Sequence, residues 1–439
     1  MHNVPDCQPL PGAASAGRVV RLGAAVCAAA LAFGVALTAC RGGTPPAPTR
    51  TPAPTAGAVA ASPVPQTSPT PVPSPMTLHV WVSPDFAATA QADGAALQGF
   101  SEMYPGVRVQ ISIKEPYGKG GLTDLLAGAS RVAPLYLPDL VLTTEDSLAE
   151  IAALGLLQPI DTLLPTARDA LFPGIGNTAR LGVPFAMDFP LLAYRTPMTL
   201  PLSWDAIAAT GGRYAFAAGN EDAAAQALLV QYLALGGPLV DAEGRPSLDG
   251  RLLTRALEAY SDLVARAILI PQAASLDNLG EVWDLYEAGQ ADFAAVLASQ
   301  VRRNAAALAD TGLAPPPAPD GGLATLARIW SWAVVSRVPE RQQAAARFLE
   351  WVLQPTQQSA WCDAAGLVPT QPSAWPLAHL SPTHSEFMLS LAQAATPYPP
   401  ALQTVAVSSA LHTALAQVLA GQLSPRQAAD QALAKIRQQ

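Results

Sequence analysis

The chain has 439 residues, of which 50% are hydrophobic and 13% are charged, and its formal net charge is −8. This length predicts two domains or two lobes with a sizeable core. The acidic balance and the lack of a basic patch argue against nucleic acid as a partner.

The N-terminus has the pattern of an export signal. Arg18 and Arg21 precede an apolar run over residues 22–37, which is shorter than the roughly 20 residues that a membrane span needs. The run ends in Leu-Thr-Ala-Cys40, and these four residues resemble the lipobox of bacterial lipoproteins. The resemblance implies that residues 1–39 are a lipoprotein signal peptide and that Cys40 is acylated.

Several acyl chains on Cys40 would anchor the protein stably at the outer face of the cytoplasmic membrane. The alternative is an uncleaved N-terminal membrane anchor with a chance cysteine. If the signal is cleaved, Cys7 and Cys27 are removed with it and Cys40 is acylated. Cys362 is then the one remaining free cysteine, so no intramolecular disulfide is expected in the mature chain. We interpret Cys362 as a small buried residue.

Residues 40–76 are expected to comprise the lipidated cysteine and a tether rich in proline and threonine. The segment 44–75 contains 11 prolines in 32 residues and cannot form a core. It indicates a semi-rigid spacer of up to roughly 100 Å, at ~3.1 Å per residue. A ligand for a proline-recognising signalling domain is the alternative.

Strands and helices alternate after the tether, which predicts a largely parallel α/β sheet. Alternating β-formers indicate the strands, and proline, glycine or the apolar spacing limits the helices. We expect strands over 77–82, 107–113 and 138–142, and helices over 87–103, 122–128 and 148–154. In such sheets ligands bind beyond the carboxyl ends of the strands.

The second half of the chain is mainly helical in this interpretation. Ser203 is an N-cap signal before an acidic first turn, and a proline opens the helix expected over 339–353. Further helices are expected over 252–268, 386–395, 402–419 and 425–436.

Ordered motifs along this part resemble the family-1 extracellular solute-binding proteins of the maltose-binding type. Each motif is short, but their order covers essentially all of 77–375. They are Leu78–Trp81, Phe100–Gly106, Pro138–Val141, Leu154–Ile160, Val183–Phe185, Leu192–Tyr194, Ser203–Asp205, Glu287–Phe293, Ala344–Leu353 and Gly366–Pro369.

The resemblance implies an α/β periplasmic-binding-protein type II fold with two lobes, a hinge and an interlobe cleft. Lobe 1 would comprise 77–186 with 330–366, and lobe 2 would comprise 187–329 with 367–439. Three crossovers are expected, near 186–188, 327–330 and 367–370.

The implied function is that of a lipid-anchored receptor that hands a small solute, first of all a sugar, to the permease subunits of an ABC importer. No cofactor and no metal are expected, and the receptor would act as a monomer. Two alternatives share the fold: binding of a peptide, polyamine or polyol, and ligand sensing for a membrane signalling protein.

The candidate ligand-binding residues are aromatic and acidic side chains near strand ends and crossovers. Aromatic faces cover the C–H surface of a sugar ring, and carboxylates pair with its hydroxyls. Core packing and helix capping are the structural alternatives at the same positions. The candidates are Trp81, Asp85, Tyr117, Glu145, Asp146, Asp188, Trp330 and Trp332.

One departure weakens the sugar assignment. The family often has a tryptophan that stacks on sugar shortly after the turn corresponding to Glu287–Phe293, but this chain has Gln300 and Arg302 in that stretch. An enzyme is not indicated, because the sequence shows no glycine-rich phosphate loop and no serine elbow. The histidines have no metal-ligand spacing beyond a loose pair, His379 and His384.

Overall fold

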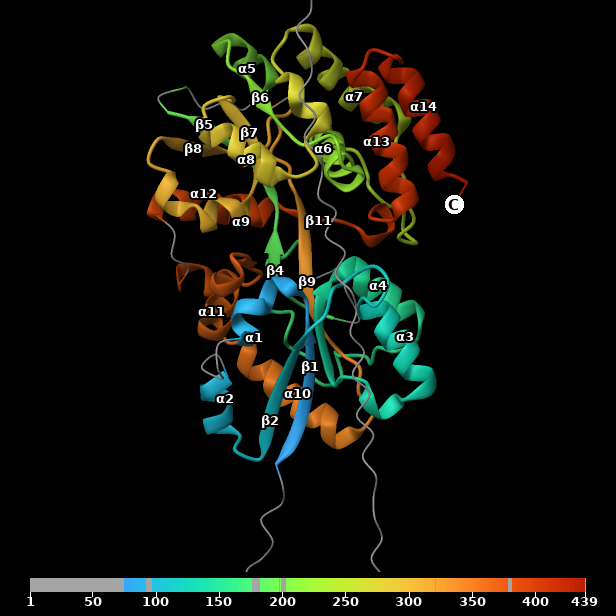
Figure 1. Ribbon diagram of the computed structural model, residues 1–439, viewed down its shortest axis with the longest axis vertical. Helices are drawn as coiled ribbons and strands as arrows, with labels where there is room; N and C mark the ends of the chain where they lie inside the picture. Colours follow the sequence, from blue (N-terminus) through green and yellow to red (C-terminus); the bar gives the residue numbers. More distant parts are fainter. Residues whose placement is uncertain are drawn as a thin grey trace, which may run out of the picture. The chain divides into compact units, whose positions relative to one another are not determined.

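The computed structural model describes residues 75–91, 97–175, 182–196, 198, 203–319, 321–377 and 381–438 (Figure 1). The expected signal peptide, Cys40, nearly all of the tether and His379 lie outside these residues. The described part belongs to one compact unit, Pro71–Gln439.

A seven-stranded sheet organises the first lobe. The strand order is β10-β4-β9-β3-β1-β2, with β11 paired to β9; β1 runs parallel to β2 and β3, and β9 runs antiparallel to β3 and β4. The strands are β1 (Met76–Val82), β2 (Val107–Ile113), β3 (Leu140–Thr144), β4 (Val183–Asp188), β9 (Leu326–Val334), β10 (Val368–Pro369) and β11 (Thr396–Pro397). All of β3 is buried, as expected for a central strand covered on both faces.

Helices cover both faces of this sheet. They are α1 (Ala87–Gln91), α2 (Gln98–Met103), α3 (Leu122–Val132), α4 (Glu145–Ala153), α10 (Pro339–Val352) and α11 (Pro355–Ala365). Aromatic rings fill the core between sheet and helices: Trp332 lies edge-on to Phe348 and Trp361. Such edge-to-face pairs favour one fixed arrangement of the core.

A four-stranded sheet organises the second lobe. Its order is β6-β7-β5-β8, from β5 (Pro190–Arg195), β6 (Tyr214–Ala215), β7 (Phe293–Leu297) and β8 (Thr311–Ala314). Its helices are α5 (Trp204–Thr210), α6 (Glu221–Ala234), α7 (Gly250–Ala265), α8 (Leu279–Glu287), α9 (Ala298–Arg303), α12 (Pro382–Ala394), α13 (Val405–Leu419) and α14 (Pro425–Ile436). In Figure 1, α13 and α14 lie side by side, and α13 also packs on α6.

Short 3-10 helices connect these elements. They are η1 (Pro84–Phe86), η3 (Pro134–Tyr136), η4 (Pro271–Ser275), η5 (Ala305–Ala307), η6 (Pro372–Leu377) and η7 (Pro400–Leu402).

Strand β9 belongs to both lobes (Figure 1). Its first residues, Leu326 and Ile329 among them, lie in the core of the second lobe, whereas Trp332 and Val334 lie in the core of the first. The chain also passes from β4 directly into β5. The two lobes are therefore joined by backbone that is itself part of a sheet, which is the arrangement from which a hinge can be built.

The α/β fold class expected from the sequence is confirmed. Strands β1, β2 and β3 lie within two residues of their expected ranges. Ser203 caps α5, accepting a hydrogen bond from the backbone N–H of Ala206 at 3.2 Å. The single helix expected over 87–103 is represented by α1 and α2, with 92–96 outside the described residues. Helices α6, α8, α9 and α11 were not predicted.

Candidate functional site

A cleft of about 1530 Å³ is the candidate site. Its walls come from both lobes and include the loop at Tyr117, the first turn of α4, the first turn of α6, Arg328 in β9, and the loop that contains Tyr398. The cleft is large enough for a solute of several rings, because ligand pockets commonly have volumes of 300–1,000 Å³.

Strand direction explains why these groups meet. The carboxyl end of β3 leads through Thr144 directly into α4, and the early residues of β9 pair beside it, with Thr144 opposite Trp330. Two positions before Trp330, Arg328 is paired with Asp188 of β4. The site therefore lies at the carboxyl ends of the strands, where the sequence analysis predicted ligand binding.

Tyr117 and Asp146 form a hydrogen-bonded pair in the first lobe. The Tyr117 hydroxyl donates to Asp146 Oδ2 at 2.6 Å and lies 2.8 Å from Thr144 Oγ1. Burial and the neighbouring Asp146 carboxylate raise the pKa of Tyr117 above its ordinary value, although Arg328 opposes the shift. The hydroxyl therefore stays protonated and serves as a donor.

Glu145 lies beside this pair and is 8% exposed. Its Oε1 accepts a hydrogen bond from the Ser331 hydroxyl at 2.8 Å. Burial raises the pKa of Glu145, and this effect exceeds the opposing influence of Ser331 and Arg168. An ion of opposite charge in the cleft would favour the ionised form.

Arg328 connects the two lobes electrostatically. It forms an ion pair with Asp222 at the start of α6. Burial would lower the pKa of Arg328, but Asp222, Tyr117 and Asp146 together raise it. These groups, with Tyr398, form a polar cluster at the cleft to which both lobes contribute.

Three of the eight residues proposed from the sequence line the cleft: Tyr117, Glu145 and Asp146. Asp85 is exposed at the end of β1, where its Oδ2 accepts hydrogen bonds from Trp330 Nε1 and from the Ser83 hydroxyl, both at 3.0 Å. Trp81 is partly buried, and Lys114 Nζ lies 5.2 Å from its ring centroid.

The other sequence candidates are buried. Trp332 is 0% and Trp330 is 5% exposed. Asp188 lies at the passage between the lobes, where its Oδ1 accepts from the backbone N–H groups of Ser299 and Phe189. Asp85, Trp81, Asp188, Trp330 and Trp332 are not among the described residues that line the cleft, and their contact with ligand stays a prediction.

Sequence reasoning missed the contribution of the second lobe to the cleft. Asn220 caps α6 by accepting from the backbone N–H of Asp222 at 2.9 Å, and Glu221 and Asp222 follow it. This Asn-Glu-Asp run is an N-cap signal that could have been recognised. Tyr398 lies between prolines in the chain that returns from α12, and no local pattern assigns it to the site.

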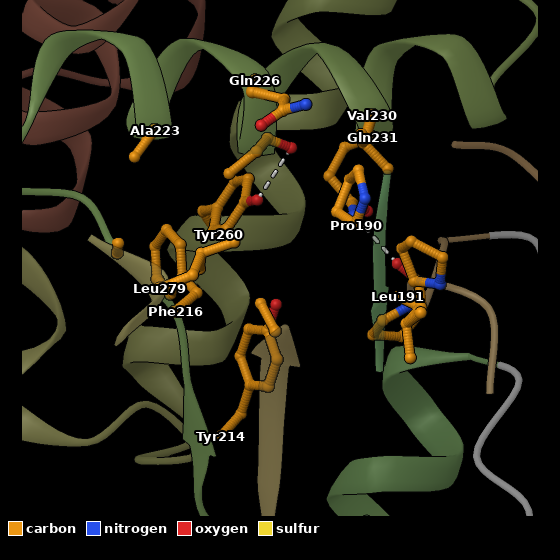
Figure 2. Close-up of a pocket in the computed structure, with 15 residues that line it drawn as sticks. Pro190, Leu191, Tyr214, Phe216, Ala223, Gln226, Val230, Gln231, Tyr260 and Leu279 are labelled. Atoms are coloured by element: carbon orange, nitrogen blue, oxygen red, sulfur yellow. Dashed lines mark hydrogen bonds between the residues drawn. The ribbon is translucent and has the colours of Figure 1, made fainter. Parts of the chain in front are cut away.

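A second, much smaller cavity lies inside the second lobe (Figure 2). Its volume is about 40 Å³, and it lies beneath α6 among Tyr214, Tyr260 and Gln231. Gln231 is held in place, since its Oε1 accepts from Trp204 Nε1 at 3.0 Å and its Nε2 donates to the Pro317 carbonyl at 2.8 Å. A space of this size accommodates a few water molecules at most.

The residues that the structure describes contain neither a candidate membrane span nor a candidate metal cluster. None of the helices combines the length and hydropathy that a membrane span requires. Within the same residues, no group of three or more His, Cys, Asp or Glu side chains is placed to hold a metal ion.

Solved structures with the same fold include several binding proteins. The cyclic alpha-maltosyl-1,6-maltose binding protein from Arthrobacter globiformis aligns with a TM-score of 0.70 and 20% identity over 83% of this chain and 99% of its own. The sugar-binding protein MalE from Xanthomonas citri aligns with a TM-score of 0.68 and 20% identity over 83% and 97%.

An ABC transporter solute binding protein from Agrobacterium radiobacter K84, solved in complex with ribitol, aligns with a TM-score of 0.61 and 18% identity over 83% of this chain and 99% of its own. At these identities the likeness shows the fold, which is the two-lobed binding-protein fold expected from the sequence.

A search of curated proteins finds no match. The family described as "Bacterial extracellular solute-binding protein" matches residues 95–383, which is well over half of the chain. The expectation of a binding protein rather than an enzyme is thereby confirmed, and the chain belongs to the bacterial extracellular solute-binding proteins.

Proposed function

We propose that this protein is the extracytoplasmic receptor of an ABC importer and captures a small, hydroxyl-rich solute in the cleft. The observation that carries the proposal is that both lobes supply polar side chains to one cavity of about 1530 Å³. A solute that contacts both lobes stabilises the closed arrangement more than the open one, and that difference is what a transporter can recognise.

The chemistry of the wall supports a polyhydroxylated ligand. The lining includes the amide of Asn220, the hydroxyl of Tyr117 and the carboxylate of Glu221. Such groups match hydroxyls, each of which donates one hydrogen bond and accepts others. Two of the similar structures are named as sugar-binding proteins and a third holds the polyol ribitol, so a carbohydrate or polyol is the first ligand class to test.

We also propose the lobe limits expected from the sequence, namely 77–186 with 330–366 for lobe 1 and 187–329 with 367–439 for lobe 2. The separate cores on either side of Ile329 and Trp330 support the boundary in β9. Limited proteolysis that cut first within one of these segments, away from residues 186–188, 327–330 and 367–370, would contradict the limits.

The lipid anchor remains part of the proposal, as do the signal peptide and the tether. Acylation at Cys40 would keep the receptor near its permease while the proline-rich segment allows it to reach outward. Cells expressing the full chain should incorporate a labelled fatty acid into it, and Cys40→Ser should abolish the label; a label that persists in the variant would contradict lipidation at this residue.

Solute binding can be measured by thermal denaturation of the purified full chain with maltose, ribitol, amino acids and short peptides. A ligand at 100 times its Kd should stabilise the folded protein by about 2.7 kcal/mol. For a protein of this size such a gain raises Tm by several degrees. Small-angle scattering should show a smaller radius of gyration with the same ligand. A panel that leaves Tm unchanged at millimolar concentration would contradict capture of a small solute.

A further inference from the structure

The cleft carries an excess of negative charge. Six carboxylates line it, against two cationic side chains, Lys119 and Arg328; the acidic residues are Asp124, Glu145, Asp146, Glu150, Glu221 and Asp222. Among these described residues, one ion pair forms, between Arg328 and Asp222. Low-dielectric walls focus the field of such a surplus into the cavity, where it attracts cations and repels anions.

Helix capping accounts for only part of this charge. Helices α3, α4, α6 and α13 begin at the cleft, and an N-terminus carries about half a positive charge. Four such termini offset roughly two of the four excess negative charges. Glu150 lies beyond the first turn of α4 and is exposed, with Thr123 Oγ1 donating to it at 3.1 Å, so it has no capping role.

Acceptor atoms in the cleft wall also lack donors. Asp146 Oδ2 accepts from Tyr117, but Asp146 Oδ1 is buried and has no hydrogen-bond partner among the described residues. The same holds for Gln403 Oε1, although Gln403 Nε2 donates to the Tyr398 carbonyl. Glu145 is 8% exposed, and among the described residues the Ser331 hydroxyl donates a hydrogen bond to it. A buried acceptor without a donor is costly.

Aromatic surface for stacking on a neutral ring is limited at the same place. Two tyrosines line the cleft, of which Tyr398 is 2% and Tyr117 is 45% exposed. Trp332 is packed in the core of the first lobe, and Trp330 donates to Asp85. An exposed tyrosine beside carboxylates suits an ammonium group, which is attracted to both the ring face and the anions.

We propose that the solute carries at least one protonated amine, held between Asp146 and Tyr117 of the first lobe and Glu221 of the second. An ammonium has three donors and no acceptor, so it complements a lining that contains six carboxylates. The inference rests on the proposed function and narrows its ligand class. Two sources share this chemistry: an amino sugar or its oligomers, and a linear polyamine.

Calorimetric titration of the full chain with matched ligands tests the inference. One arm compares the trimer of glucosamine with its N-acetylated form, which has the same rings without the charges. The other arm compares spermidine with 1,8-octanediol. We expect the amine to bind at least about tenfold more tightly than its neutral partner in one arm, and this preference should fall several-fold between 50 and 500 mM salt because the salt screens the charges.

The arm in which the amine binds more tightly than its neutral partner identifies the source of the amine. Equal binding of N-acetylated and free trimers, or binding of maltose alone without salt dependence, would overturn the inference and leave the proposed function intact. If neither charged nor neutral solutes bind, both proposals fail.

Charge-removing variants provide the second test. Asp146→Asn keeps an acceptor for Tyr117 but removes the negative charge, and Glu221→Gln does so in the second lobe. Each should weaken amine binding at least about tenfold, and by more than it weakens binding of the neutral partner. The matched control is Glu258→Gln, an exposed position on α7 outside the cleft, which should not change either affinity. Unchanged amine affinity in both Asp146→Asn and Glu221→Gln would overturn the assignment of the amine to this wall.

Discussion

Replacement of Trp332 with alanine is expected to lower the free energy of unfolding by about 3–5 kcal/mol, the range for deleting a large buried aromatic side chain. The side chain is fully buried in β9, where its ring centroid lies 5.8 Å from that of Phe185, 5.6 Å from that of Phe348 and 5.8 Å from that of Trp361. Loss of the indole would leave a cavity that three rigid rings cannot close.

Trp332→Phe is the matched comparison. Trp332 Nε1 is buried without a hydrogen-bond partner among the described residues, and phenylalanine removes this unsatisfied donor while keeping one aromatic ring. We expect a loss below about 1.5 kcal/mol. Equilibrium unfolding in urea measures both variants. Near-native stability of Trp332→Ala would contradict the core role, and loss of solute binding in a stable Trp332→Phe would instead favour the stacking role expected from the sequence.

Local patterns were sufficient for the strands of the first lobe. Buried Leu78, Val80 and Val82 alternate in β1 with residues that are less buried, and this period of two is visible in the sequence. Prolines and capping residues also set helix boundaries well, because α14 begins at Pro425 after Ser424, whose hydroxyl accepts from the backbone N–H of Gln427. These features depend on neighbours in the sequence.

Helix α6 was missed because it has no single apolar face. It is buried on several sides, with Ala224, Leu228, Val230 and Tyr232 all inside the second lobe. The sequence of such a helix shows a continuous apolar run instead of apolar residues that recur every 3.6 positions. Only its cap, Asn220, carried a local signal.

The residues of the candidate site also differ in whether local sequence could predict them. Glu145 and Asp146 could be placed because they follow a strand directly, and the carboxyl ends of strands form the binding edge. Arg328 could not, since its partner Asp222 is 106 residues earlier in the chain. Tyr398 reaches the cleft because β11 pairs with β9, a contact between distant segments that no periodicity encodes.

The sequence predicted that Asp188 lies near a crossover between the lobes. It did not predict the environment of the Asp188 side chain. Asp188 lies at the end of β4 under the N-terminus of α9, and its Oδ1 accepts from the N–H of Ser299 at 2.9 Å and that of Phe189 at 3.0 Å. Burial raises the pKa of Asp188 to about 6, from an ordinary value of 3.8, despite these hydrogen bonds and the charge of Arg303. The carboxylate form therefore costs free energy in the folded state.

A carboxyl group with a raised pKa in the folded state makes the protein less stable as pH rises. The folded protein binds the Asp188 proton more tightly than the unfolded chain does, so this residue's contribution falls as pH rises from about 4 to about 6. A shift of about two pKa units corresponds to about 3 kcal/mol. Asp188→Asn keeps an acceptor for Ser299 without the charge, and it should be up to about 3 kcal/mol more stable than the native chain at pH 7.5.

The difference between Asp188→Asn and the native chain should shrink toward zero at pH 4, where the native carboxyl is protonated. Urea unfolding at a series of pH values measures this difference, and other titrating groups cancel because both chains share them. Asp284→Asn, an exposed position on α8, should stay within about 0.5 kcal/mol at each pH. If Asp188→Asn were instead less stable at pH 7.5, the ionised carboxylate would be stabilising the passage between the lobes, with Arg302 and Arg303 on α9 as the charges that compensate its burial.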